Sequence, residues 1–338
     1  MLHVPVKIGA VNLRLGTNFP QAFKFSVLIC WKLCYNQRTN KEVVEMKALN
    51  FGSLNLDYVY QVDHFVRPGE TLDALHQTVN PGGKGLNQSV ALAKAGAAVC
   101  HAGCVGQGGG MLRQTLESYG VDTAYLRETG TLQGNAIIQV DRSGQNCILL
   151  YGGSNRCLTE AQISETIAQF SPGDWLILQN ETNLLPELVE AGFAKGMRVV
   201  LNPSPYNETI AQVDLSKVSW LLVNEVEAKQ CSGTDEPEKV WTYLHERYPV
   251  LSLLVTLGSV GSAAFTESER IRQPAFPVKA VDTTAAGDTF TGYFIAGLME
   301  NRPLADCLRR ASMAAAVSVT RPGAAPSIPG KEEVERLI

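Results

Sequence analysis

The chain has 338 residues, of which 45% are hydrophobic and 18% are charged, and its formal net charge at pH 7 is −4. This is the composition of a globular protein with a large core. Because the charge is weakly negative and no basic cluster is present, nucleic acid and anionic membranes are excluded as the main partner.

The eight cysteines form no CxxC pair and no zinc-type spacing with histidine; they stand at positions 30, 34, 100, 104, 147, 157, 231 and 307. Free thiols in a chain of this size indicate a reducing compartment. We therefore expect a cytoplasmic protein.

Residues 1–45 lack the alternation of strand and helix signals that follows them. Their apolar run, residues 25–31, is too short to span a bilayer and precedes no convincing signal-peptide cleavage site. From Met46 the pattern changes abruptly to a strand at residues 48–51. We therefore expect residues 1–45 to be a dispensable or disordered extension and residues 46–338 to form the functional domain.

Strand and helix signals alternate from Met46 onward. Helices are predicted at residues 85–95, 111–119 and 186–195, and after a capping box that starts at Thr159. Strands are predicted at residues 48–51, 98–105, 175–179, 198–201, 220–223 and 251–256. Such alternation predicts a parallel sheet covered by helices on both faces.

Two segments depart from this alternation. Residues 57–81 contain strand-like stretches without a helix, and residues 136–140 and 147–151 flank a turn sequence typical of a hairpin, Asp141-Arg142-Ser143-Gly144. Both are too short to form a second core. We predict a small β-sheet lid, from about residues 57–81 and 130–152, over the carboxyl edge of the sheet.

The stretch between Asp282 and Asp288 consists of small residues and precedes a helical pattern in which Phe290, Phe294 and Leu298 share one face. It predicts a tight turn that leads into a buried helix, whose N-terminal N–H groups suit an anion. Taken alone, the stretch is better explained as an ordinary helix start in which Asp288 only complements the helix dipole.

Several catalytic motifs are absent, namely the P-loop, the dinucleotide-binding GxGxxG after a strand, GxSxG and HExxH. A glycine-rich segment, residues 81–88, stands at the entry to a helix. Its glycines let the backbone approach a ligand, while Lys84 and Asn87 can donate to hydroxyl groups. An ordinary glycine turn is the alternative, although three glycines in four residues carry an entropic cost that a plain turn does not need.

Polar residues also follow other predicted strands, where open α/β sheets bind ligands. In chain order the signals are Asn55 and Asp57, Gly82-Gly83-Lys84-Gly85-x-Asn87-Gln88, Asn224-x-x-Glu227, Thr256-Leu257-Gly258-Ser259 and Asp282-Thr283-x-Ala285-Ala286-Gly287-Asp288. Each is weak alone, but the series resembles the ribokinase-like (phosphofructokinase-B type) carbohydrate kinases over residues 46–338.

The resemblance implies an α/β fold, a three-layer α/β/α sandwich with a mostly parallel central sheet and a small β-sheet lid. It also implies an ATP-dependent sugar kinase that phosphorylates the 5-hydroxyl of D-ribose, giving ribose 5-phosphate and ADP. In this pattern Asp288 is the base, and the N–H groups of Ala285, Ala286 and Gly287 form an anion hole. The helix N-terminus is expected to lower the pKa of Asp288, which makes it a weak base at rest.

The resemblance assigns the other site residues to four groups. The sugar-binding group is Asn55, Asp57, Gly82, Gly83, Lys84, Gly85, Asn87, Glu181 and Asp288. The ATP-binding group is Asn224, Thr256, Leu257, Gly258, Ser259, Val260, Gly261, Gly287 and Ser312. Magnesium is assigned to Glu227 through water, and potassium to Asp282, Thr284, Ser318, Arg321, Gly323 and Ser327.

Two positions depart from the family pattern. Ser312 stands where relatives often carry Asn or His beside the adenine, and Asn135 stands in the lid where an aliphatic residue is common. We expect Asn135 to alter the sugar preference. The exposed strands of the lid imply a homodimer formed through it.

Other functions stay open from the sequence. A sister kinase for deoxyribose, a ketohexose or a nucleoside would share Asp288 and differ in the pocket. A non-catalytic sugar-binding sensor would have lost Asp288 or the small residues beside it, and all of these are present. A dehydrogenase would carry GxGxxG after the first strand, which is missing.

Overall fold

The computed structural model describes residues 4–8, 11–15 and 46–338. The chain divides into two units, Met1–Glu45 and Met46–Ile338. In the first unit, β1 (Val4–Ile8) and β2 (Val11–Leu15) pair antiparallel. The apolar run at residues 25–31 lies outside the described residues, and the dispensability of the extension stays a prediction.

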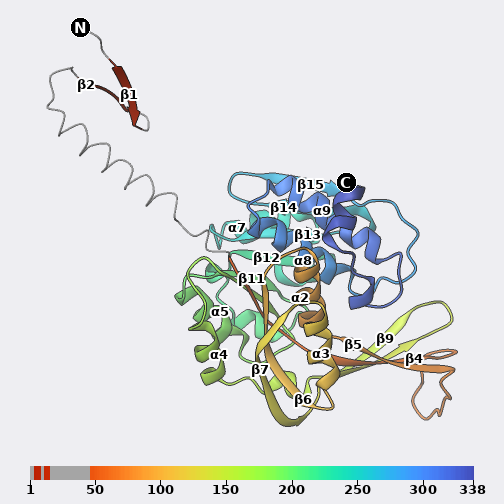
Figure 1. Ribbon diagram of the computed structural model, residues 1–338. Helices are drawn as coiled ribbons and strands as arrows, with labels where there is room; N and C mark the ends of the chain where they lie inside the picture. The colour runs from red at the N-terminus through yellow and green to blue at the C-terminus, as the bar shows by residue number, and fades with distance from the viewer. Residues whose placement is uncertain (1–3, 9–10, 16–45) are drawn as a thin grey trace. The chain divides into compact units, whose positions relative to one another are not determined.

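The second unit is built around a nine-stranded sheet, whose order is β15-β14-β13-β12-β11-β10-β3-β6-β7 (Figure 1). All strands from β13 to β7 are parallel, and β14 and β15 extend one edge antiparallel. The strands are β3 (Ala48–Phe51), β6 (Val99–Gln107), β7 (Asp122–Leu132), β10 (Trp175–Gln179), β11 (Arg198–Asn202), β12 (Trp220–Asn224), β13 (Ser252–Thr256), β14 (Gly261–Phe265) and β15 (Arg270–Pro274). Every residue of β10 is buried, as its continuous apolar sequence predicts.

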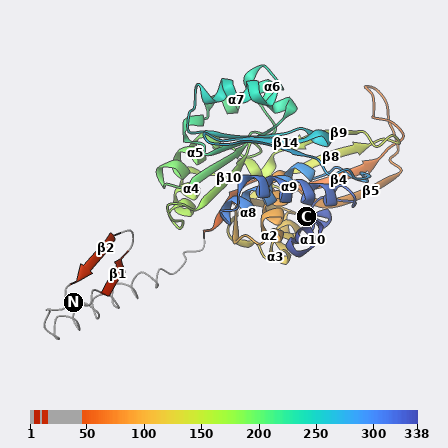
Figure 2. The ribbon, with the colours of Figure 1, turned by 90° about the horizontal axis from the view of Figure 1, so that it is seen from above.

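Helices cover both faces of this sheet, so the predicted three-layer sandwich is confirmed (Figure 2). One face carries α2 (Lys84–Lys94), α3 (Gly110–Ser118), α8 (Ala286–Met299), α9 (Leu304–Ser318) and α10 (Lys331–Leu337). The other carries α4 (Glu160–Ile167), α5 (Leu185–Ala194), α6 (Glu225–Ser232) and α7 (Pro237–His245). Each face has its own buried hydrophobic cluster.

A separate four-stranded sheet projects from the sandwich, in the order β5-β4-β8-β9 (Figures 1 and 2). Its strands are β4 (Asn55–Gln61), β5 (His76–Gly82), β8 (Asn135–Val140) and β9 (Asn146–Tyr151). We call it the lid sheet. The predicted hairpin is confirmed as β8 and β9, but residues 130–132 belong to β7 of the main sheet rather than to the lid. The sequence missed β7 and β15 because exposed positions interrupt their apolar pattern, and it missed β14, whose buried sequence is Gly261-Ser262-Ala263-Ala264-Phe265, because small residues give only a weak strand signal.

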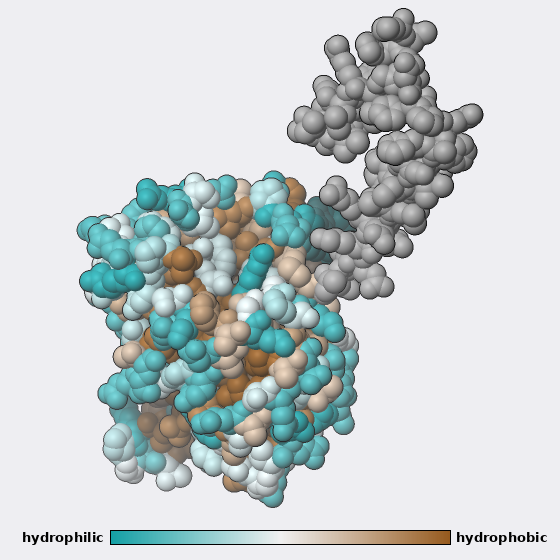
Figure 3. All heavy atoms as spheres, turned by 90° about the vertical axis from the view of Figure 1, so that its left-hand side faces the viewer, coloured by the Kyte–Doolittle hydropathy of each residue, from teal (hydrophilic) through white to brown (hydrophobic). Residues whose placement is uncertain are grey.

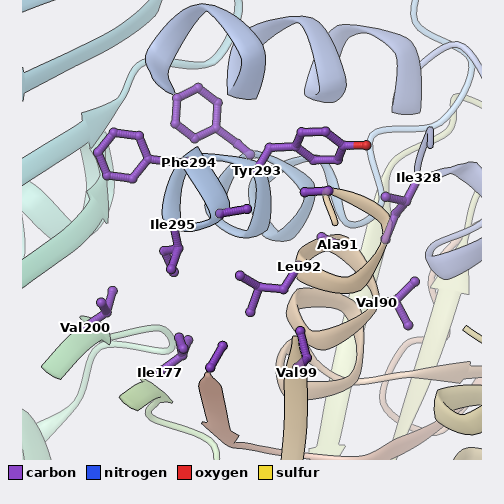
Figure 4. Packing of buried hydrophobic residues seen from close by; sticks show 14 of the residues in the cluster. Val90, Ala91, Leu92, Val99, Ile177, Val200, Tyr293, Phe294, Ile295 and Ile328 are labelled. Carbon is purple, nitrogen blue, oxygen red and sulfur yellow. The ribbon is translucent and has the colours of Figure 1, made fainter. Parts of the chain in front are cut away.

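Helices α2 and α8 pack against each other over the sheet (Figure 4). A Cβ atom at Gly292 would stand 2.4 Å from the Cβ of Ala91, so glycine permits this approach. The hydroxyl of Tyr293 donates to the carbonyl of Pro329 at 2.8 Å. The predicted face of Phe290 and Phe294 is buried, and so is most of the rest of α8. The packing brings the N-terminal ends of both helices to one place.

Candidate functional site

All four predicted catalytic residues meet in one pocket of about 250 Å³ at the carboxyl edge of the main sheet, together with some of the predicted ligand-binding residues. The predicted residues that line it are Lys84, Asn224, Glu227, Thr256, Ala285, Ala286, Gly287 and Asp288. The sequence did not predict the remaining lining residues, Asn202, Ser204, Leu222, Val223, Leu254, Thr283 and Thr291. The ends of β11, β12 and β13 thus supply one wall, and the start of α8 supplies the other.

A larger groove, of about 750 Å³, runs between α4 and α5 and includes none of the predicted residues. These helices lie on the side of the molecule that faces the viewer in Figure 3, where hydrophobic patches are scattered among hydrophilic residues. The smaller pocket is therefore the candidate site, since it alone of these two gathers the predicted chemistry.

The start of α8 presents free backbone donors to the pocket. Ala285 adopts a left-handed conformation with φ 58°, unusual for a residue that is not glycine. In the described part of the chain, the N–H groups of Ala285, Gly287 and Asp288 have no acceptor, while that of Ala286 donates to Thr283 O at 3.3 Å. Free N–H groups at a helix N-terminus suit an anion. The sequence had not predicted the N–H of Asp288 among them.

The side chain of Asp288 is buried beside these donors. Its Oδ1 accepts from Gln88 Nε2 at 2.9 Å and its Oδ2 from Asn87 Nδ2 at 3.2 Å. Burial raises the pKa of Asp288, against the lowering effects of Lys84, Gln88 and Asn87. The expectation of a lowered pKa is therefore wrong, because the loss of hydration outweighs the charge of Lys84 and the hydrogen bonds. The result is a carboxylate better suited to accept a proton.

Lys84, the first residue of α2, lies among three carboxyl groups. Burial lowers the pKa of its ammonium group, but Asp288, Glu181 and Glu227 together raise it above the ordinary value. Lys84 is therefore charged at neutral pH. Because its side chain lines the same pocket as the free N–H groups, it can also neutralise phosphate, in addition to the sugar contact that the sequence predicts.

The predicted sugar-binding acids, Asp57 and Glu181, lie next to this pocket. Glu181 accepts from the backbone N–H of Lys84 at 3.2 Å and from the hydroxyl of Ser53, which the sequence did not assign. Burial raises the pKa of Asp57 to about 7, with smaller contributions from Glu181 and Asp288. A Cβ at Gly82 would stand 1.9 Å from Asp57 Oδ2, so glycine makes room for this carboxyl group.

The two predicted asparagines differ in their partners. Asn55 Oδ1 accepts from Asn155 Nδ2 at 2.7 Å, and Asn155 in turn accepts from the backbone N–H of Leu54 at 2.9 Å. Asn87 Oδ1 is buried and has no hydrogen-bond partner among the described residues. A buried unpaired acceptor is costly, so this atom fits a ligand hydroxyl.

Asn135 does not lie with these residues. It pairs with Leu56 across the lid sheet, whereas Ala136 pairs with Asp57. Because paired residues project from the same face of a sheet, Ala136 shares the face of Asp57 and Asn135 lies on the opposite one. Asn135 therefore cannot contact a sugar bound on the face of the lid sheet that carries Asp57.

Glu227 and Asn224 form a capping box at the start of α6. Asn224 Oδ1 accepts from Glu227 N at 2.8 Å, and Glu227 Oε2 accepts from Asn224 N at 3.1 Å. Glu227 Oε1 has no such bond among the described residues and belongs to a pocket-lining side chain. This arrangement fits a carboxylate that holds magnesium through water, since magnesium retains most of its hydration shell.

Asp282 joins the two segments of the predicted potassium site. Its Oδ1 accepts from Thr284 N at 2.9 Å and its Oδ2 from Gly323 N at 2.8 Å. Burial acts to raise the pKa of Asp282, but the hydrogen bonds from Thr284 and Gly323 lower it overall. The hydroxyls of Ser318 and Ser327 donate to nearby carbonyl groups, and Arg321 pairs with Glu333.

No cluster of three or more His, Cys, Asp or Glu side chains capable of metal binding occurs in residues 4–8, 11–15 and 46–338. In the same ranges, no helix is both long and apolar enough to cross a membrane, and the six cysteines from Cys100 onward are free.

Five further residues of the predicted ATP-binding group, Leu257 to Gly261, connect β13 to the start of β14. Residues 258–260 form a 3₁₀ turn, and Gly261 has φ 127°, where a Cβ would stand 2.1 Å from Gln273 O. Only glycine fits there. Ser312 is buried in α9 and is not among the residues that line the pocket.

Comparisons with known proteins agree with this site. The pfkB family carbohydrate kinase profile matches residues 46–331. The chain is 35% identical to ribokinase of Haemophilus influenzae, over 83% of this chain and 95% of that protein. It is 32% identical to deoxyribokinase of Salmonella typhimurium, over 85% of this chain and 97% of that protein. The structure of Arabidopsis thaliana ribokinase complexed with ribose and ATP matches with a TM-score of 0.78 and 28% identity, covering 87% of this chain and 99% of that one.

The family match spans the lid sheet and the sandwich up to the first residue of α10, including every segment that carries a predicted site residue. The sequence resemblance is thereby confirmed, and the activity is that of a ribokinase-type sugar kinase. The chain belongs to the pfkB family of carbohydrate kinases.

Proposed function

We propose that the protein phosphorylates the 5-hydroxyl of D-ribose with ATP, giving ribose 5-phosphate and ADP. The observation that carries this proposal is the convergence in one pocket of a buried carboxyl group, a charged lysine and free backbone N–H groups. Phosphoryl transfer needs a proton acceptor and positive charge around the moving group. The similarity to ribokinases, one of them solved with ribose and ATP, supports these substrates.

Asp288 acts as the base in this proposal. The sugar oxygen forms a bond to the γ-phosphorus, the bond from that phosphorus to the β-γ bridging oxygen breaks, and the hydroxyl proton passes to Asp288. The free N–H groups of Ala285 and Gly287 stabilise the charge on the moving phosphoryl group, with Lys84 beside them. The N–H of Ala286, also expected in the anion hole, would have to give up its 3.3 Å contact with Thr283 O to join them. Each such donor is worth about 3 kcal/mol in a preorganised site.

The sugar hydroxyls bind to the side chains of Asn55, Asp57, Asn87 and Glu181 and to the backbone of the glycine-rich segment. The unpaired Asn87 Oδ1 and the carboxyl groups of Asp57 and Glu181 supply hydrogen-bond acceptors next to the pocket. A sugar with several hydroxyl groups satisfies such acceptors, whereas an apolar ligand would leave them unpaired.

Magnesium bound with ATP neutralises phosphate charge, and Glu227 with Asn224 would hold it through water. A potassium ion would lie at Asp282, with oxygens of Thr284, Ser318, Arg321, Gly323 and Ser327. Asp282 keeps the loop before α8 tied to Gly323, so its role is to steady the turn that forms the anion hole.

A sister activity on deoxyribose is the second candidate, because a deoxyribokinase is 32% identical to this chain. The two sugars differ by the 2-hydroxyl. Binding deoxyribose would leave a polar group of the pocket without its partner, which lowers affinity for it. We therefore place ribose first.

A coupled kinase assay across ribose, deoxyribose, fructose and nucleosides, with and without potassium, tests the proposal. We expect the highest kcat/KM for ribose and activation by potassium. A higher kcat/KM for deoxyribose would move the assignment to the sister activity. Binding of sugar without turnover on any of them would instead support the sugar-binding sensor.

We also propose a cytoplasmic homodimer that forms through the lid sheet. The edge strand β9 exposes Ile148, Leu149 and Leu150, a surface unusual for an unpaired strand. The free thiols support a reducing compartment.

A further inference from the structure

A line of buried amide side chains leads from Asp288 into the interior of the protein. Gln88 Nε2 donates to Asp288 Oδ1 at 2.9 Å. Gln179 Nε2 donates both to Gln88 Oε1 at 2.8 Å and to Asn50 Oδ1 at 2.9 Å. Gln88 and Asn50 are fully buried and Gln179 is 1% exposed, so water does not compete for these bonds. We call Gln88, Gln179 and Asn50 the amide line.

The amide line has a fixed direction. Asn50 Nδ2 donates to the backbone carbonyl of Gly85 at 2.8 Å, and a carbonyl can only accept, so Asn50 must turn its oxygen toward Gln179. Gln179 therefore presents its NH₂ group to Asn50 and to Gln88. Gln88 must accept from it and present its own NH₂ group to Asp288. A reversed Gln88 would set its oxygen against the carboxylate.

One atom of the amide line has no partner. Gln179 Oε1 is buried without a hydrogen-bond partner among the described residues, which is costly. A Cβ at Gly52 would stand only 2.4 Å from this oxygen, so glycine makes room for it. What the Gln179 amide supplies at this position is its NH₂ group, which pairs the oxygens of both Gln88 and Asn50.

We propose that Gln88 is a positioning residue for Asp288, and that Gln179 fixes the direction in which the Gln88 amide points. The inference rests on the proposed role of Asp288 as the base. Gln88 holds Oδ1 and stabilises the ionised carboxylate. It leaves Oδ2 to take the proton, since among the described residues that atom has only the longer contact with Asn87, at 3.2 Å.

Other titratable groups share this region, and the measurement must separate their titration from that of Asp288. They are Lys84 of α2, Asp57 of β4, Glu181 after β10, Glu227 of α6 and His101 of β6. Burial lowers the pKa of His101 to about 4, so it is neutral over the useful range. Asp57, with a pKa of about 7, is assigned to sugar binding. The pH profile is therefore read from kcat at saturating ribose and ATP, not from kcat/KM.

The test compares Gln88→Met, Gln179→Met and the double variant. Loss of the Gln88 donor makes ionised Asp288 less stable, so the acid limb of kcat should move about one unit to higher pH. Gln179→Met should move it in the same direction by less. Because Gln179 acts through Gln88, the double variant should match Gln88→Met alone.

Gln162→Met is the matched control, since Gln162 is a buried amide that donates to Gly103 O at 2.9 Å in another part of the core. It should lower Tm and leave the acid limb unchanged. If Gln88→Met does not fold, Gln88→Glu takes its place, because glutamate keeps the shape of the side chain. Its carboxyl group removes the donor and repels ionised Asp288, so the acid limb of kcat should again move to higher pH.

The inference would be overturned if the acid limb of kcat did not move in the Gln88 variant. It would also be overturned if the shifts of the two single variants added in the double variant. Asp288→Asn separates this failure from that of the proposed function. If Asp288→Asn is inactive while the limb does not move, only the positioning role fails. Near-normal turnover in Asp288→Asn would show that Asp288 is not the base, and the proposed mechanism would fail with it.

Discussion

Gly292 of α8 lies against Ala91 of α2 so closely that a Cβ at position 292 would stand 2.4 Å from that of Ala91. The backbone of Ala91 and Leu92 is also within 2.8 Å of that point, so no flexible side chain can yield. Because α2 carries Lys84, Asn87 and Gln88 while α8 starts with the free backbone N–H groups, this contact sets the distance between the two halves of the candidate site.

Gly292→Ala should destabilise the protein by about 1–3 kcal/mol, since overpacking outweighs the better helix propensity of alanine. Thermal unfolding measures the loss as a lower Tm. Gly130→Ala is the control, because a Cβ at Gly130 has open space around it. Equal Tm values for both variants would show that the helices can move apart freely.

Asp288→Asn should lower kcat by about a thousandfold, because the amide keeps the shape of the side chain but cannot accept the proton. ATP affinity, measured by calorimetry, should change little, as the free backbone N–H groups proposed to bind the phosphates remain.

Asp57→Asn tests a pH effect on stability. The pKa of Asp57 is raised from 3.8 to about 7 in the folded protein. The folded state therefore binds this proton more tightly, and stability is lost as pH rises from about 4 through 7. Above pH 7 the Asn variant should exceed the wild type in unfolding free energy by on the order of 2–4 kcal/mol, while binding ribose less well. The two stability curves should converge below pH 4; curves that stay parallel at all pH values would contradict the raised pKa.

Deletion of residues 1–45 should leave Tm and kcat unchanged. The family match begins at residue 46, and the sandwich and lid sheet are formed by residues 46–338. Loss of folding or of turnover in the shortened chain, measured beside the full chain, would assign the extension a role.

Leu149→Lys in β9 should convert the proposed homodimer to a monomer, as measured by light scattering on a sizing column. Leu149 is 68% exposed, and a charge at the dimer contact cannot be buried without a partner. Val250→Lys is the control, because Val250 is 72% exposed but lies outside the lid sheet. If Leu149→Lys had the same molecular mass in solution as the wild type, β9 would not be part of a dimer interface.

The sequence predicts the core of the fold well because its parallel strands are continuous apolar runs, as in β10, whose bounds it places correctly. It fails at β7 and β15, where many positions are exposed and the apolar signal is broken. Local pattern carries no information about which strand forms an edge.

For the site, the sequence places Lys84 and Asp288 but not the environment that decides their charge. A helix N-terminus alone argues for a lowered pKa of Asp288, and only the fold shows that burial reverses the direction. Gln88 stands beside Asn87 in the quoted motif, yet its contact with Asp288 spans 200 positions. Gln179 closes β10 at the binding edge, which is the one local signal that points to it.

Asn55 and Asp57 belong to β4 of the lid sheet, whereas Lys84 and Asp288 are fixed by the packing of α2 on α8. In the proposed function, one part of the sugar-binding group therefore lies in the lid sheet, whereas the phosphate-transfer groups lie at the starts of α2 and α8. Substitutions in the lid strands can thus change contacts to the acceptor without altering the packing of α2 on α8, which gives this architecture a route to divergent specificities.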